Sequence, residues 1–500
     1  MLFLASILMA CQEEKVNPNR NLTLDVFSTL KTQAYSVNTT HIVEQLDELV
    51  RQDKGALPID RYVRSYYGNH NPLLWIDYLG ADHRADSLLA WIEGAEREGL
   101  SGKMLRRKQI ADDLHRLRTL NVDDADNDIN RLTARLEYNL TRAFLRYCSV
   151  QQYGFLRPAD VYNRLWVKDS DSVRVTYQRV FDIPVERLGE DFFHRALDKI
   201  SHDSVAVFLR EVQPKSQLYA LLCNRLASDT LTREQRLLTL CNMERCRWRE
   251  KEKAEQYRKY VVVNIPAFKL YAVDGDSTLE MRVGCGTVKT KTPLLTSKIM
   301  RMDINPQWIL PKSIAKGIVH STGYMHRNNM FIADRKLGRL DASQASYTKI
   351  MNGEQHIVQE GGPGNSLGRI IFRFENNFSV FLHDTNSPGF FTRDSRAVSH
   401  GCVRIQRPLD FAVFLLADKD ADLIERLRYS MTANINGRGD QGSKDSIDRS
   451  RLLHQLKVEP EVPLFITYFT LYPDADGTLR QYPDVYGYDK AIVRQLTPYL

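Results

Sequence analysis

The stretch Tyr260 to Val273 reads YVVVNIPAFKLYAV, in which apolar and β-branched residues alternate with others. This period of two is typical of β-strands, and Leu279 to Val288 continues it. Further along, Gly368 to Asp384 predicts a hairpin, with IIFRF as one arm, Asn376-Asn377 as the turn and FSVFLH as the other. The carboxyl-terminal half is therefore expected to be mainly β.

On both sides of this stretch the pattern changes. From His41 to about Lys253 apolar residues recur at helical spacing, and Thr232 to Gln235 has the form of a capping box that places Cys241 on a buried helical face. The charge run from Arg245 to Lys253 alternates in sign and favours a solvated helix end. Downstream, Pro408 predicts a helix to about Ile424.

These patterns predict an α+β protein in which a helical domain precedes a mainly β domain. Residues 312–360 are too long for an ordinary strand connection and indicate a helical insertion that caps the site as a lid. The expected parts are 41–255 as the helical domain, 256–435 as the β domain, 436–460 as a flexible loop, and 461–500 as a strand and tail that complete the β domain.

Composition excludes several classes of protein. The 500 residues are 43% hydrophobic and 26% charged, as in ordinary globular chains. The net charge of +7 is a slight excess over this length, so it gives little support to nucleic-acid binding. Seven cysteines are too few for a disulfide scaffold, and Cys148, Cys223, Cys241, Cys246 and Cys285 are expected to be packing residues.

The amino terminus has the pattern of a secretion signal. Residues 1–10 are apolar, too short to span a bilayer, and end before Cys11. Leu8-Met9-Ala10-Cys11 resembles the lipobox of bacterial lipoproteins, although no Lys or Arg precedes the apolar run. The resemblance implies a lipid anchor on Cys11, residues 11–40 as a tether, and a membrane-anchored protein of the periplasm in the cell envelope.

The residues that carry chemistry are His383-Asp384 and, after them, Ser399-His400-Gly401-Cys402-Val403-Arg404. A thiol attacks as its thiolate, and a nearby imidazole supplies the base. Gly401 removes bulk beside the thiol, a main-chain amide there or at Cys402 is a candidate oxyanion donor, and Arg404 is suited to a carboxylate or developing charge. Buried structural residues, or a zinc site of His383, His400 and Cys402, are alternatives that spacing leaves open.

This pattern resembles the signature of the L,D-transpeptidase catalytic domain. Both the interval from His383 to SHGC and the trailing Arg404 match. The flanking segments that also resemble the large, multidomain branch of that family are NIPAFKLY (264–271), INPQWILP (304–311), GPGNSLGRI (362–370), FLHDT (381–385) and, upstream, RSYYGNHNPLLWID (64–77), LTRAFLRYCSVQQYG (140–154) and NMERCRW (242–248).

The resemblance implies an enzyme of bacterial peptidoglycan that acts as a monomer without a cofactor or metal. Cys402 would form a thioester with the third residue of a tetrapeptide stem, release D-Ala and pass the acyl group to a second stem as a 3→3 crosslink. His383 would be the base, oriented by a backbone carbonyl near Asp384. The residues expected to line the site are Ser399, His400, Gly401, Arg404, Asp384, Trp308, Asn365 and, in the lid, Tyr324.

One departure from the large branch concerns glycan binding. Leu218 to Asp229 runs almost directly into Leu231 to Trp248, which leaves no room for the small wall-binding module that this branch often carries. The alternatives for function are hydrolysis, with water as the acceptor in a carboxypeptidase or endopeptidase, a zinc protein, and a wall-binding lipoprotein without activity.

Overall fold

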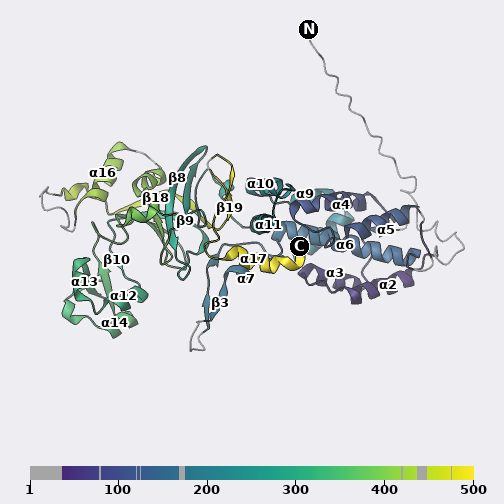
Figure 1. Ribbon diagram of the computed structural model, residues 1–500, viewed down its shortest axis with the longest axis horizontal. Helices are drawn as coiled ribbons and strands as arrows, with labels where there is room; N and C mark the ends of the chain where they lie inside the picture. The colour runs from purple at the N-terminus through teal and green to yellow at the C-terminus, as the bar shows by residue number, and fades with distance from the viewer. Residues whose placement is uncertain are drawn as a thin grey trace, which may run out of the picture. The chain divides into compact units, whose positions relative to one another are not determined.

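The computed structural model describes residues 36–77, 80–119, 121–123, 126–167, 175–417, 420–435, 447–474 and 476–500. The chain forms two compact units (Figure 1). The first comprises the described residues up to Leu156 together with Glu186–Arg249 and Ile492–Leu500, and the second comprises Arg157–Val185 and Glu250–Ala491. The predicted boundaries are corrected in two places, because 157–185 belongs to the β unit and 492–500 to the helical unit.

The first unit is helical. It surrounds α6 (Ile129–Tyr153), which is buried along most of its length and buries polar and charged side chains, such as Glu137 and Arg146, as well as apolar ones. Asp128 caps this helix by accepting from the N–H groups of Asn130 and Arg131. The other helices are α2 (Thr39–Gln52), α3 (Pro58–Gly68), α4 (His83–Gly94), α5 (Arg107–Thr119), α8 (Glu190–Ser201), α9 (Val205–Glu211), α10 (Gln217–Leu226) and α11 (Arg233–Arg247).

The capping box predicted before α11 is confirmed, since Thr232 and Gln235 bond each other's backbone, and Cys241 is buried. The predicted solvated end of this helix is wrong. Arg247 is 3% exposed, and its guanidinium donates to Gln151 Oε1 and Tyr219 Oη, at 3.1 Å each. Residues from three helices meet there, which a local charge pattern does not reveal. Cys148 and Cys285 are also buried, as expected of packing residues.

The second unit is a closed β structure. The sheet runs β14-β15-β17-β8-β7-β6-β18-β9-β5, β16 joins it at β8, and β14 also pairs with β9, so that the sheet closes on itself. Its strands are β5 (Phe181–Asp182), β6 (Lys259–Asn264), β7 (Lys269–Asp274), β8 (Ser277–Gly286), β9 (Leu294–Ile304), β14 (Ile370–Phe374), β15 (Leu382–His383), β16 (Ala397–Ser399), β17 (Val403–Ile405) and β18 (Gln455–Thr467).

The opening stretch forms the hairpin β6 and β7, paired from Lys259↔Asp274 to Asn264↔Lys269, so it is two strands separated by a turn. The hairpin predicted over 368–384 is present as β14 and β15, with Ile371 opposite His383. Short pieces complete the unit: α7 (Pro158–Tyr162), β3 (Arg164–Val167), β4 (Val175–Gln178), β19 (Leu471–Pro473), β20 (Leu479–Gln481) and α17 (Tyr488–Leu496), whose last residues are counted with the first unit.

The insertion between β9 and β14 has a core of its own, built around Leu310, Met325, Ile332 and Ile357. It contains the expected helices and, in addition, a four-stranded sheet in the order β10-β13-β11-β12. Its elements are β10 (Trp308–Ile309), α12 (Lys312–Ile318), α13 (Thr322–Arg327), β11 (Met330–Asp334), β12 (Arg339–Leu340), α14 (Tyr347–Asn352) and β13 (Gln355–Gln359).

The two chain segments that enter and leave the insertion touch. A Cβ placed on Gly361 would lie 2.2 Å from the carbonyl oxygen of Asn305, so only glycine permits this approach. The insertion therefore begins and ends at one point of the barrel.

Two predictions after the site need correction. The helix expected from Pro408 to Ile424 is two helices, α15 (Pro408–Leu415) and α16 (Ala421–Thr432). The loop expected over 436–460 ends earlier, because β18 begins at Gln455, and residues 436–446 lie outside the described part. The late strand predicted from Pro463 is the second half of β18.

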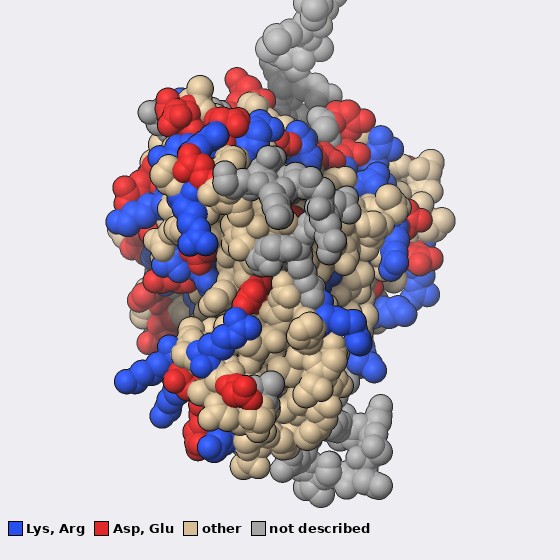
Figure 2. Space-filling model, turned by 90° about the vertical axis from the view of Figure 1, so that its left-hand side faces the viewer, with Lys and Arg blue, Asp and Glu red and all other residues tan. Residues whose placement is uncertain are grey.

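The signal peptide, most of the tether and Cys11 also lie outside the described residues. In the described part, no helix combines the length and apolar character needed to cross a bilayer. On the face shown in Figure 2, Lys and Arg are interspersed with Asp and Glu, in keeping with the small net charge.

Candidate active site

The barrel brings the two halves of the sequence motif together. Strands β15 and β17 pair in parallel, with Leu382 opposite Val403 and His383 opposite Arg404. The Val403 N–H donates to the Phe381 carbonyl at 2.9 Å, which continues the pairing by one residue. Cys402, directly before β17, therefore lies beside the strand that ends at His383.

The main chain fixes the orientation of the His383 imidazole. The side chain is buried, and Nδ1 lies 2.5 Å from the Asp384 carbonyl oxygen and 3.3 Å from that of Leu367. Since carbonyl oxygens only accept, Nδ1 carries the proton and Nε2 is left as the basic nitrogen. The expected orientation by a carbonyl near Asp384 is confirmed, and sequence analysis missed the second carbonyl, that of Leu367.

Electrostatics keep this imidazole neutral. Burial, followed by the positive charge of Arg404, lowers the pKa of His383 to about 4, against the bonds to the two carbonyls. Burial raises the pKa of the Cys402 thiol, while a backbone hydrogen bond from Phe381 and the charge of Arg404 act in the opposite direction. At neutral pH the site therefore rests as thiol and neutral imidazole, and the imidazole is able to accept the thiol proton.

Arg404 supplies positive charge, and no carboxylate of the described residues forms an ion pair with it. Its guanidinium lies over the Phe390 ring, 5.7 Å from the centroid. Its Nε is buried and has no hydrogen-bond partner among the described residues. Burial lowers the pKa of Arg404, and the neighbouring Cys402 opposes that shift. A buried cation of this kind suits a substrate carboxylate, a thiolate or an oxyanion. No sequence pattern pointed to Phe390 as its support.

The turn before the thiol is held by hydrogen bonds. Gly401 has φ +120°, a conformation that favours glycine. The Ser399 hydroxyl donates to the Cys402 carbonyl at 2.6 Å and accepts from the Gly401 N–H at 3.1 Å. Thr292 donates to the Gly401 carbonyl at 2.9 Å. Sequence analysis missed Thr292, which lies far away in the chain in a segment without a motif.

These bonds decide which amide is available for an oxyanion. The Gly401 N–H is occupied by Ser399, which weighs against it as a donor. The Cys402 N–H has no acceptor in the described part of the chain, so it is the stronger of the two candidates. Ser399, expected to line the site, is a positioning residue instead, because it is 3% exposed and its hydroxyl is used within the turn.

Asn365 and Asp384 are also corrected from substrate contacts to positioning residues. Asn365 is 1% exposed; its amide donates to the Glu360 carbonyl at 2.8 Å, and its Oδ1 accepts from the Leu367 N–H at 2.8 Å. It thus shapes the loop whose Leu367 carbonyl contacts His383. The Asp384 carboxylate accepts from the Arg369 N–H at 2.7 Å and holds the other end of that loop.

The remaining predicted residues lie in three different settings. His400 is exposed next to the thiol. Trp308 is half-buried and packs against the core of the insertion, which fits the core-packing alternative, and it pairs with Gln359 through β10. Tyr324 lies on α13 with 43% of its surface exposed, and no contact given for it reaches the thiol.

Within the described ranges, no three His, Cys, Asp or Glu side chains are grouped so that they could hold a metal ion. The Nδ1 atom of His383 is already bonded to carbonyl oxygens, which leaves one ring nitrogen for any other role. The geometry therefore offers an imidazole base, a thiol and a buried cation as its reactive groups.

Comparison with known proteins finds two domain matches and one curated relative. The L,D-transpeptidase catalytic domain matches residues 258–423, and the Scaffold domain matches residues 61–226. A putative L,D-transpeptidase of Haemophilus influenzae is 26% identical over 311 residues, which cover 60% of this chain and 59% of that protein. The chain thus spans about three fifths of that relative's length.

Among solved structures, an L,D-transpeptidase from Mycobacterium smegmatis is similar over 42% of this chain and 58% of its own, with 13% identity. The TM-score is 0.19, so no structural argument is drawn from this match. The two domain matches fall on the helical unit and on the barrel, and the second includes His383, Cys402 and Arg404. The chain therefore contains a segment that matches the L,D-transpeptidase catalytic domain, preceded by a segment that matches the Scaffold domain.

Proposed function

We propose that this chain is a cysteine-dependent L,D-transpeptidase that joins peptidoglycan stem peptides through a thioester on Cys402. The single observation that supports this most is the pairing of β15 with β17, which brings the segment of Cys402 beside the strand that ends at His383, a buried residue whose Nδ1 is fixed by two carbonyl oxygens. That arrangement leaves Nε2 as a base for the thiol, which acyl transfer requires.

In the first half-reaction, the Cys402 thiol gives its proton to His383 Nε2 as sulfur attacks the carbonyl carbon of the third stem residue. A C–S bond forms, the peptide C–N bond to the terminal D-Ala breaks, and the imidazolium returns the proton to the departing amine. In the second, the side-chain amine of another stem gives a proton to His383 and attacks the thioester. The new C–N bond forms, the thiolate leaves, and it regains its proton from the imidazolium.

Charge in these steps develops next to Arg404. Because no carboxylate in the described ranges pairs with this cation, its field is available to the thiolate and to the oxyanion of the tetrahedral intermediate. The Cys402 N–H is the main-chain donor that we assign to the oxyanion. Both groups are fixed before substrate arrives, the first by Phe390 and the second by the Ser399 turn.

The insertion over 312–360 serves as a lid over the donor stem in this proposal. Its separate core and its single point of attachment support movement as one piece. Hydrogen exchange of 312–360 is expected to slow when Cys402 is acylated, and unchanged exchange would reject the lid.

We further propose that the protein works as a monomer, anchored in the cell envelope of a bacterium through a lipid on Cys11, with its catalytic unit in the periplasm. The lipobox-like Leu8-Met9-Ala10-Cys11 carries this part of the proposal. Metabolic labelling with a fatty-acid analogue is expected to mark the parent chain and not a Cys11→Ala variant.

The decisive experiment incubates the protein with purified tetrapeptide-rich muropeptides and weighs the products and the protein. Crosslinked dimers one D-Ala lighter than two monomers, together with a protein adduct absent from Cys402→Ala, are expected. Tripeptides without dimers would instead identify a carboxypeptidase that uses water. Full activity in Cys402→Ala would reject the thiol mechanism, as would stoichiometric zinc with activity lost to a chelator.

A further inference from the structure

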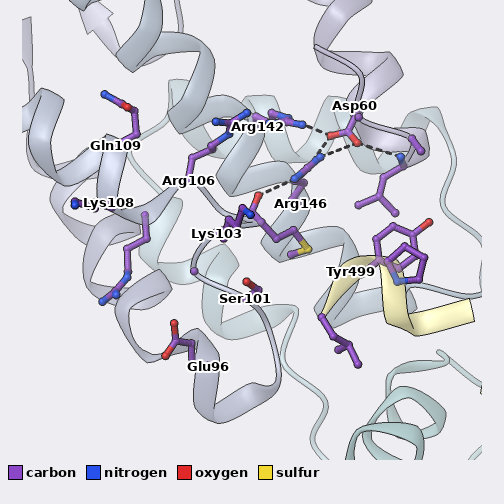
Figure 3. Close-up of a pocket in the computed structure, with 18 of the residues that line it drawn as sticks. Asp60, Glu96, Ser101, Lys103, Arg106, Lys108, Gln109, Arg142, Arg146 and Tyr499 are labelled. Atoms are coloured by element: carbon purple, nitrogen blue, oxygen red, sulfur yellow. Dashed lines mark hydrogen bonds and ion pairs between the residues drawn. The ribbon is translucent and has the colours of Figure 1, made fainter. Parts of the chain in front are cut away.

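The scaffold domain contains a large polar pocket remote in sequence from the catalytic motif. Its volume is about 1040 Å³, at the upper end of the range for ligand pockets. The loop before α5 and the start of that helix form one wall, and the segment Pro498 to Leu500 forms another. Figure 3 shows Lys108 and Gln109 on the side opposite Tyr499, whose ring stacks on Phe155 at 5.1 Å.

Positive charge dominates the lining. Six basic side chains and three acidic ones face the pocket. The acids are Asp60, Glu96 and Asp112, and the basic residues are Lys103, Arg106, Arg107, Lys108, Arg142 and Arg146.

Two of the arginines are neutralised and rigid. Asp60 is fully buried and accepts two hydrogen bonds from Arg146, at 2.7 and 2.9 Å, and one from Arg142 at 3.3 Å (Figure 3). Arg142 also donates to Asp53 at 2.9 Å. These ion pairs form the floor of the pocket. Hydrogen bonds between the buried charges offset the free-energy cost of their desolvation and leave the side chains little freedom to rearrange.

The other four cations are not neutralised in this way. Among the described residues, Lys103, Arg106, Arg107 and Lys108 take part in no ion pair. They occur within six consecutive positions, so their like charges repel one another. Burial and the charge of Arg146, with a smaller contribution from Arg106, lower the pKa of Arg142 against the opposing charges of Asp53 and Asp60.

The backbone adds to this potential. Helix α5 begins at Arg107 with no acidic residue in its first turn, although helix starts favour acids over bases. In the described structure, the N–H groups of Lys108 and Gln109 have no acceptor. Arg106 has φ +55°, a strained conformation for a residue with a side chain. Basic residues, open N–H groups and strain thus coincide at one wall of the pocket.

We propose that this pocket binds a ligand that carries two or more anionic groups, carboxylates or phosphates, through Arg106, Arg107 and Lys108. Guanidinium groups donate bidentate hydrogen bonds to carboxylates and phosphates. The open N–H groups at the start of α5 are further donors to the same anionic groups. The volume admits a ligand of several sugar or amino-acid units. The site is separate from the thiol chemistry, and it does not depend on the proposed function.

The test uses the full chain as Cys402→Ala, so that no probe is consumed. Two probes are titrated separately by calorimetry: inorganic pyrophosphate and a purified disaccharide tetrapeptide. Hydrogen exchange of residues 101–112 then locates the binding. The test variant adds Arg106→Gln and Arg107→Gln. The matched control adds Arg187→Gln and Arg210→Gln, which remove the same charge from exposed positions of the scaffold unit outside the pocket.

We expect at least one probe to slow exchange over 101–112 and to bind at least tenfold more weakly to the test variant, with the control unchanged. Protection by pyrophosphate alone identifies a phosphate ligand, and protection by the tetrapeptide identifies a carboxylate ligand. The proposal is overturned if neither probe protects 101–112, or if protection persists in a test variant with an unchanged melting temperature. Failure of the thioester assay alone leaves this result intact.

Discussion

Arg146 in the scaffold is buried and Arg404 in the barrel is half-buried, but among the described residues only Arg146 has a carboxylate partner. Arg146 is 9% exposed in its side chain and is held by the fully buried Asp60. Arg404 lies against the Phe390 ring with an unbonded Nε. A buried cation with its own counter-ion holds the fold together, whereas one without a counter-ion holds charge ready for something that arrives later. In the proposed mechanism, the scaffold thus uses buried charge for rigidity, and the barrel uses the charge of Arg404 for chemistry.

The largest effect that this comparison predicts is on stability. Asp60→Ala leaves Arg142 and Arg146 without their shared carboxylate, and we expect the scaffold to lose about 3 to 5 kcal/mol of unfolding free energy. Chemical denaturation, monitored by hydrogen exchange of α6, measures this loss of unfolding free energy. Asp112→Ala removes an exposed acid from the same pocket and is the control, expected to be neutral. An equally small loss in both variants would show that Asp60 is not a structural counter-ion.

The counterpart in the barrel is Arg404→Gln. We expect the rate of thioester formation to fall about a hundredfold, or about 3 kcal/mol, because the preorganised charge is lost. The melting temperature is expected to stay the same or rise, since no partner is left unpaired. Single-turnover mass spectrometry gives the rate, and Arg404→Lys, which keeps the charge, is expected to retain part of it. A loss of stability without a loss of rate would make Arg404 a structural residue like Arg146.

The His383 imidazole gives the barrel a pH-dependent stability that reports on the charge of Arg404. The pKa of His383 is about 4 in the folded chain and about 6.5 when unfolded, so between these values the unfolded state binds more protons. The contribution of His383 to the free energy of unfolding is therefore fully present above about pH 6.5. It falls as the pH decreases towards 4, and about 2 kcal/mol is lost at pH 5. Hydrogen exchange of residues 370–384 in urea, compared between pH 6.5 and pH 5, measures this loss of unfolding free energy.

Two variants check the cause of that pH dependence. His383→Gln is expected to remove this part of the slope. Arg404→Gln is expected to raise the pKa of His383, because the charge of Arg404 contributes to lowering it. An unchanged histidine titration by NMR in Arg404→Gln would contradict the proximity of the two charges.

The smallest effect concerns the turn before the thiol. Ser399→Ala removes the bridge between the Gly401 N–H and the Cys402 carbonyl, at an expected cost of about 1 kcal/mol in stability and a several-fold slower acylation. Ser387→Ala deletes an exposed hydroxyl nearby and serves as the control. A normal rate in Ser399→Ala would show that the turn is held without it.

The sequence predicted what local patterns encode. The strand alternation after Tyr260, the capping box at Thr232 and the position of His383 at a strand end depend on neighbours in the chain, and all appear in the structure. It could not predict contacts between distant segments. Arg247 was expected in solvent, but it lies against Gln151 and Tyr219 from other helices.

In the candidate site, too, the sequence marked residues that lie in motifs but did not predict contacts between segments that are distant in the chain. Asn365 and Ser399 stand in the family motif, which marks them as important without saying why. The structure shows that both act on the backbone around His383 and Cys402, through bonds to Glu360, Leu367 and the turn itself. Thr292 and Phe390 belong to no motif. Their contacts with Gly401 and Arg404 join segments that are distant in the chain, so they can be recognised only in the folded barrel.

The contact between Asn305 and Gly361 has a consequence for how this architecture can be altered. An element whose two ends meet can be excised and replaced by a tight turn at small cost in chain entropy, and a different element can be grafted there. The insertion is therefore a part of the chain that can be exchanged while the barrel stays intact. Exchange of that insertion between relatives would alter the proposed lid over the donor stem without redesign of the nucleophile, and such recombination is a route by which one thiol chemistry can diversify.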